Sequence, residues 1–155
     1  MAAAVSMGGC GYGMGGGESS VLGPNSSTLK IQGVEHTTVY PWLGQVIRTK
    51  LRDEVAARNL AVWVDSGNAD YSIQIKVSNF TVRTALHDDE RRAVLSTAML
   101  QLEGVVRRSA DNTEIWRSGL ISYSDTVESV NEEQAADALA AQAVRILVSR
   151  MRQNF

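Results

Sequence analysis

A change of hydrophobic period in the middle of the chain constrains the fold most. Across residues 43–55, apolar side chains recur at intervals of three and four, which predicts an amphipathic helix. Across residues 71–77 they alternate strictly with polar side chains, which predicts a half-buried antiparallel strand. The alternation slips by one residue before Phe80, so we expect a bulge near Ser78-Asn79. Such a chain must pack helices against a sheet.

The remaining elements follow from the same reasoning. Asn131 is the expected N-cap of a closing helix, because Glu132 and Glu133 follow it where the helix dipole favours acidic side chains. Pro41 suits the first turn of the earlier helix, and Asn59 is its expected C-cap. The predicted strands are residues 28–34, 60–64, 71–82, 93–107 and 114–126, and the helices are residues 41–58 and those from 131 onward.

The order β-α-β-β-β-β-α predicts an α+β fold. We expect a two-layer sandwich, with two helices packed on one face of a mostly antiparallel four-stranded sheet. A chain of 155 residues is long enough for one domain with a real core, which we place at residues 28–155. Residues 1–27 are expected to be a leader remnant and a flexible Gly/Ser-rich arm, since they offer few side chains to bury.

Composition and charge exclude several classes of protein. The net charge is −2 and charged residues make up 21% of the chain, so no basic field favours nucleic acid. No apolar run approaches the roughly 18 residues that span a bilayer. Any membrane attachment is therefore expected to come from a lipid or from a partner.

The single cysteine, Cys10, has no second cysteine for a disulfide or a CxxC motif. Met7-Gly8-Gly9 precedes it, which fits a lipobox with Met in place of the usual Leu and predicts acylation of the Cys10 thiol. Residues 1–6 lack the basic and apolar regions of a secretory leader. Two interpretations stay open: a truncated or replaced start before a lipidated cysteine, or a cytosolic chain with an incidental free thiol.

Signals for catalysis or metal binding are weak. His87-Asp88-Asp89-Glu90 is the one cluster of metal-ligating residue types, but four successive hairpin residues cannot all point at one ion. We interpret it as a solvated hairpin tip. No GxSxG motif, paired His/Asp arrangement or phosphate-binding loop is present. We therefore expect no catalytic residue, no metal and no cofactor.

Arginines gather at both ends of the predicted sheet. Arg83, Arg91 and Arg92 flank the central hairpin tip, and a second group comprises Arg107, Arg108 and Arg117. Arginine binds phosphate in a bidentate manner, so one end can hold an anionic head group, and we favour the tip. The alternative is that both groups are solvated strand ends that protect the sheet edges.

The layout from Cys10 onward resembles the lipopolysaccharide-assembly lipoproteins of the LptE family. Cys10-Gly11-Tyr12 is similar to the characteristic start of mature members, Cys-Gly-Trp/Tyr/Phe. A Pro-initiated helix then precedes the strand entry Ala69-Asp70-Tyr71-Ser72-Ile73, two long hairpins and a closing helix. The resemblance covers residues 10–155 and is mainly one of layout.

This resemblance implies a non-enzymatic lipoprotein on the periplasmic side of the outer membrane, anchored through a lipid on Cys10. Members plug the LptD barrel, help it assemble and bind lipopolysaccharide, with basic residues of the hairpin tip implicated. Arg91 and Arg92 retain that feature, whereas the stretch 124–133 lacks the basic residue that some members carry before the last helix. The main alternative is another periplasmic α+β lipoprotein that serves as an accessory subunit of a secretion or envelope complex.

Overall fold

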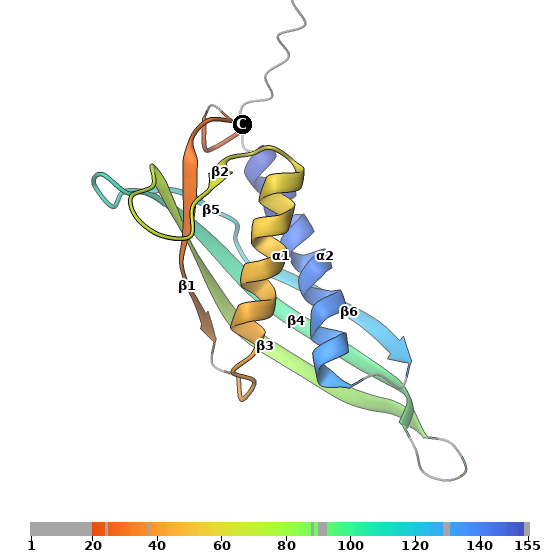
Figure 1. The fold of residues 1–155 in the computed structure, drawn as a ribbon. Helices are drawn as coiled ribbons and strands as arrows, with labels where there is room; N and C mark the ends of the chain where they lie inside the picture. The colour runs from red at the N-terminus through yellow and green to blue at the C-terminus, as the bar shows by residue number, and fades with distance from the viewer. Residues whose placement is uncertain are drawn as a thin grey trace, which may run out of the picture.

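The computed structural model describes residues 20–23, 25–36, 38–87, 89, 93–128 and 131–153. Two helices lie side by side on one face of a long sheet, as predicted (Figure 1). The elements in chain order are β1 (Thr28–His36), α1 (Leu43–Ala57), β2 (Val62–Trp63), β3 (Tyr71–His87), β4 (Ala93–Arg108), β5 (Glu114–Arg117), β6 (Ile121–Glu128) and α2 (Glu132–Arg152).

The sheet has six strands and is mixed, so the prediction of a mostly antiparallel four-stranded sheet is wrong. Its order is β2-β1-β3-β4, and both β5 and β6 pair with β4. β1 runs parallel to both β2 and β3, while β3 and β4 are antiparallel. The helix α1 crosses over between β1 and β2, and such a connection returns the chain parallel to its start. Alternation of side chains reveals the buried face of a strand but not the direction of its neighbour.

The strand predicted over 114–126 is broken in two. Residues 118–120 separate β5 from β6, and Gly119 adopts a φ of 66°, which favours glycine. Trp116 and Ile121 are both buried and pair with residues on the helix-facing side of β4, although an odd spacing of five separates them. The interruption therefore resets the alternation and lets both side chains enter one core.

Two other local predictions are confirmed. The β3–β4 register shifts between Val77 and Asn79, which is the expected bulge. The Asn131 side chain accepts a hydrogen bond from the Gln134 N–H at 2.8 Å, as an N-cap does. The C-cap of α1 is Arg58 and not Asn59 as predicted; Asn59 follows it in a left-handed conformation that closes the helix.

The core lies between the helix layer and the sheet. The helices contribute Leu43, Ile47, Leu51 and Val55 from α1 and a wider, alanine-rich stripe from α2, and the sheet contributes its helix-facing apolar side chains. Leu22, from the range predicted as an arm, is also fully buried. No helix in the described ranges combines the length and the hydropathy needed to cross a bilayer.

Helix α2 packs closely over Gly104 of β4. A Cβ at this position would lie 2.7 Å from Leu147 Cδ1 and 3.3 Å from Ile75 Cδ1. Both neighbours are buried, so neither side chain can move into solvent. The absence of a side chain at Gly104 therefore sets the distance between α2 and the sheet.

We expect Gly104→Ala to lower the free energy of unfolding by about 1 kcal/mol. Overpacking costs about 1–3 kcal/mol, and the lower entropy of the unfolded chain offsets up to about 1 kcal/mol of it. Gly33→Ala in β1 is the matched control, because its new Cβ would meet nothing within 4 Å. The urea midpoint should fall for Gly104→Ala and rise for Gly33→Ala. Equal midpoints for the two variants would contradict the packing argument.

Asp70 ties the start of β1 to the start of β3. Its Oδ2 accepts hydrogen bonds from the Thr28 N–H and the Thr28 hydroxyl, both at 2.8 Å. The Thr28 hydroxyl oxygen in turn accepts from the Asp70 N–H. The Thr28 backbone and side-chain donors hold the pKa of the Asp70 carboxyl below its usual value.

This depressed pKa makes the contribution of Asp70 to stability dependent on pH. A carboxyl with a lower pKa in the folded state stabilises the fold above its unfolded pKa, about 3.9, and the effect is lost as the pH falls through the folded pKa. We therefore expect Asp70→Asn to lower the urea midpoint at pH 7, and we expect this deficit to shrink as the pH falls through the folded pKa of Asp70. Asp53→Asn, an exposed carboxylate on α1, should leave the midpoint nearly unchanged at pH 7. A deficit for Asp70→Asn that persists unchanged in acid would overturn the interpretation.

Candidate functional site

The predicted tip lies at the distal end of β3 and β4, which extend past both helices (Figure 1). Arg83 is exposed there and pairs across the hairpin with Thr97. Arg91 and Arg92 lie outside the described residues, as does Cys10, so their proposed roles stay predictions. Of the His87-Asp88-Asp89-Glu90 cluster only Asp89 has a described side chain, which is exposed. Within the described ranges, no three His, Cys, Asp or Glu residues are grouped to hold a metal ion.

The second arginine group does not form one site. Arg117 donates to Glu114 at 2.8 Å and lies 3.2 Å from Glu103. Hydrogen bonds to Glu114 and then Glu103 raise the pKa of Arg117, and Arg117 in turn lowers the pKa of Glu114. Arg107 donates to Gln74 Oε1 at 3.1 Å. Both side chains therefore hold the sheet surface together.

The outer face of the sheet, which is the face turned away from the helices, is polar near this network. Gln74 receives the hydrogen bond from Arg107 and itself donates to Glu35 across β1 and β3. Lys76 lies between Glu35 and Glu103 in the register. A shallow recess of about 150 Å³ opens among these side chains. Charges of both signs alternate over this part of the surface.

Toward the tip, the outer face becomes uncharged. Phe80 and Leu100 are buried beneath the helices, so their strand neighbours point the other way. The register aligns these outward positions in rows across β3, β4 and β6. The polar residues in these rows are Asn79, Gln101, Ser122, Thr81, Ser124, Thr97 and Thr126. This half of the outer face is thus a surface of hydroxyls and amides that ends at Arg83.

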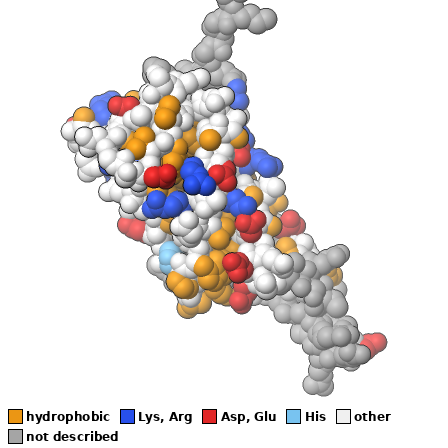
Figure 2. All heavy atoms as spheres, viewed as in Figure 1, with side chains coloured by type: hydrophobic (Ala, Val, Ile, Leu, Met, Phe, Trp, Pro, Cys, Tyr) orange, Lys and Arg blue, Asp and Glu red, His pale blue; other side chains and the backbone are white. Residues whose placement is uncertain are grey.

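The helix side of the molecule is also mainly polar. Figure 2 shows acidic and basic side chains interspersed over the helix layer, and hydrophobic atoms gathered near the lower end of that layer. Among described residues, the large apolar side chains that are exposed are Val39, Val62 and Leu120. They belong to three different segments of the chain. Tyr40, Trp42 and Phe80 form a cluster of tilted and edge-on rings beside Val39, with centroids 5.2–6.2 Å apart.

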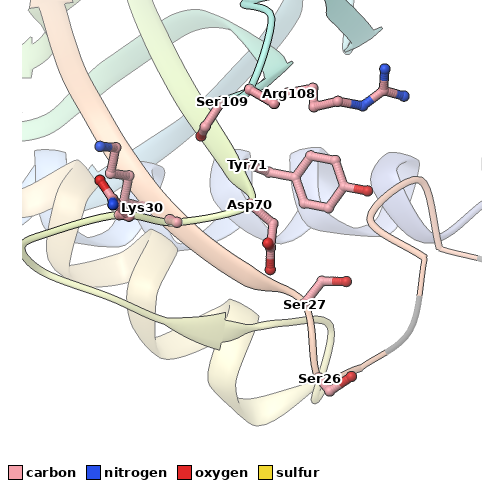
Figure 3. A pocket seen from close by; sticks show the side chains of 10 residues that line it. Ser26, Ser27, Lys30, Asp70, Tyr71, Arg108 and Ser109 are labelled. Atoms are coloured by element: carbon pink, nitrogen blue, oxygen red, sulfur yellow. The ribbon is translucent and has the colours of Figure 1, made fainter.

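A cleft of about 700 Å³ opens at the opposite end of the sheet from the tip. The start of β1, the start of β3 and the end of β4 surround it, and the side chains around it include Ser27, Lys30, Asp70, Tyr71 and Arg108 (Figure 3). Sequence reasoning noted Asp70-Tyr71 as a strand entry and Arg108 as part of an arginine group. The β3–β4 pairing sets Tyr71 opposite Arg108, and the parallel pairing of β1 with β3, which was not foreseen, adds Ser27 and Lys30.

Comparison with solved structures identifies the fold. A PelC dodecamer from Paraburkholderia phytofirmans has a TM-score of 0.59 at 13% identity, covering 83% of this chain and 92% of that one. A putative lipoprotein from Caulobacter crescentus has a TM-score of 0.51 at 17% identity, covering 77% and 87%. Uncharacterized lipoprotein B from Nitrosomonas europaea has a TM-score of 0.52 at 14% identity, covering 83% and 81%. At these identities the similarity shows the fold alone.

Comparison by sequence identifies the family. No curated protein matches the chain. The model of the family described as LptE, lipopolysaccharide-assembly, matches residues 26–151, which include every strand of the described chain, α1 and all of α2 except its last residue. The chain therefore belongs to the LptE family of lipopolysaccharide-assembly proteins, as its layout predicted.

Proposed function

We propose that this protein is a non-enzymatic lipoprotein on the periplasmic side of the outer membrane. It plugs and helps assemble an LptD-type barrel and binds lipopolysaccharide during transport to the cell surface. Family membership supports the part in lipopolysaccharide assembly. The observation that carries the plug role is the outer face of the sheet, which no described element covers and which is mostly polar, with apolar side chains such as Met99 and Val105 among the polar ones.

A plug of this kind needs a polar surface because barrel interiors are polar. The sheet buries its apolar side chains against α1 and α2, so its outer face carries hydroxyls, amides and paired charges. Charged side chains on this face are neutralised by neighbours of opposite charge, as Arg117 is by Glu103 and Glu114. Such a surface can enter a polar lumen without exposing a large apolar patch.

Acylation at Cys10 would supply the membrane anchor. Nine residues lie between Cys10 and Ser20, the first described residue, so ten Cα-to-Cα steps join them. An extended chain of that length spans at most about 35 Å. The arm is therefore long enough to let the domain reach a barrel beside its lipid, and several acyl chains give stable anchoring where one does not.

We expect the full-length tagged protein to co-purify with an outer-membrane barrel of the LptD type after detergent extraction from its host. Mass spectrometry of the captured complex identifies the partner, and a tagged unrelated outer-membrane lipoprotein serves as the control. Capture of secretion or other envelope components without such a barrel would instead support the accessory-subunit alternative. Capture of no barrel would sink the plug role.

For the tip, we expect Arg91→Glu combined with Arg92→Glu to weaken lipopolysaccharide binding, because both changes replace phosphate-binding cations with repelling anions. Thermal stability should stay nearly unchanged, since exposed charges contribute little to it. Arg52→Glu combined with Arg145→Glu makes the same change of charge at exposed positions on the two helices and is the matched control. If the two double variants bind lipopolysaccharide equally well, the tip arginines are solvated surface residues and not binding residues.

A further inference from the structure

The cleft at the end of the sheet brings an aromatic ring between two opposite charges. Figure 3 shows the Tyr71 ring with Arg108 on one side and with Asp70 and Ser27 on the other. Tyr71 and Arg108 are direct cross-strand partners in the β3–β4 register. The Ser109 N–H donates to the Asp70 carbonyl at 2.9 Å, which closes the same end of the hairpin. Backbone pairing therefore fixes the spacing of all three side chains.

Asp70 presents a fixed negative charge to the cleft. Its Oδ2 is held by the two Thr28 donors, and these bonds keep the carboxyl ionised at neutral pH. Within the described part of the chain, no hydrogen bond reaches its second oxygen, Oδ1. One carboxylate oxygen thus orients the group, while the other is free to accept a bond from a ligand.

Arg108 presents a positive charge that is only weakly engaged. Its Nη1 lies 3.3 Å from Asp111 Oδ2, and the two side chains are 51% and 49% exposed. Such an exposed pair contributes little and gives way easily. The planar guanidinium keeps further N–H donors with which to bind a phosphate. This distinguishes Arg108 from Arg117, which two carboxylates hold.

These charges decide between classes of ligand. Asp70 repels a simple anion, and Arg108 repels a simple cation. Lys30 also lines the cleft, but its amine donates to the Gly67 carbonyl at 3.2 Å and lies on the other side of β3 from the Tyr71 ring (Figure 3). A ligand with both a phosphate and an amine satisfies both groups, and an ammonium also binds favourably against the face of a tyrosine ring. We propose that this cleft binds a phosphoethanolamine-type headgroup, with its phosphate on Arg108 and its amine between the Tyr71 ring and the Asp70 carboxylate.

The place of the cleft in the fold fits such a ligand. Ser26 and Ser27 line it, and they lie close in sequence to Ser20, where the described part of the chain begins. The described chain therefore enters the domain at its cleft end and not at the tip (Figure 1). The inference goes beyond the barrel role and does not rest on it, so that either can fail alone.

The test is a titration of the purified full chain, carrying Cys10→Ser to keep it free of acyl groups, followed by backbone amide shifts in NMR. We expect glycerophosphoethanolamine to give saturable shifts at Asp70, Tyr71 and Ser109. Glycerol 3-phosphate and ethanolamine, which each lack one charge, should bind about tenfold more weakly or worse. Short-chain phosphatidylethanolamine distinguishes the source: equal affinity indicates that the free headgroup suffices, and tighter binding indicates a lipid.

Variants separate binding from folding. Arg108→Gln and Tyr71→Leu should each weaken binding of glycerophosphoethanolamine about tenfold, whereas Tyr71→Phe keeps the ring face and should bind like the wild type. Arg145→Gln removes an exposed arginine from α2 and is the matched control. The proposal is overturned if glycerol 3-phosphate or ethanolamine binds as tightly as glycerophosphoethanolamine, if Arg108→Gln and Tyr71→Leu bind normally, or if the shifts map elsewhere.

Discussion

The antiparallel pairing of β3 with β4 is the interaction on which the rest of the structure depends. Its register runs from Tyr71 opposite Arg108 to His87 opposite Ala93. One edge of this long hairpin receives β1, and the other receives β5 and β6 in succession. The two candidate sites belong to opposite ends of the hairpin: the predicted tip to the end where β3 leads into β4, and the cleft to the open end. A change in register would therefore displace the core and both sites together.

The one-sided helix layer follows from the sequence of that hairpin. Its helix-facing positions are apolar and its outward positions are polar, with a bulge at Ser78 that keeps the apolar set on one face despite the change of phase. Gly104 then lets α2 pack directly on the backbone of β4. The sheet therefore has one apolar face, buried beneath the helices, and one exposed face that is mostly polar.

Local features of the fold could be predicted from the sequence because they depend on neighbours along the chain. The period of residues 43–55 and 71–77, the bulge near Ser78 and the N-cap at Asn131 are examples, and each is confirmed. The direction of β1 was missed because it depends on a partner 42 residues away, where Thr28 and Asp70 bind each other. The break at Gly119 was missed because alternation alone does not show where a strand stops and restarts.

The same difference between local and long-range contacts applies to the two candidate sites. The tip stands out in the sequence because Arg83, Arg91 and Arg92 lie close together around one predicted turn, and its role in binding stays a prediction. The cleft could not be predicted, because it joins three strand ends that only the mixed sheet brings together. The second group of arginines shows this difference most directly. Arg107, Arg108 and Arg117 look equivalent in the sequence, yet Gln74 engages the first and two carboxylates hold the third. Arg108 lines the larger cleft and meets one exposed carboxylate at 3.3 Å, so its surroundings, and not its residue type, make it a candidate for binding phosphate.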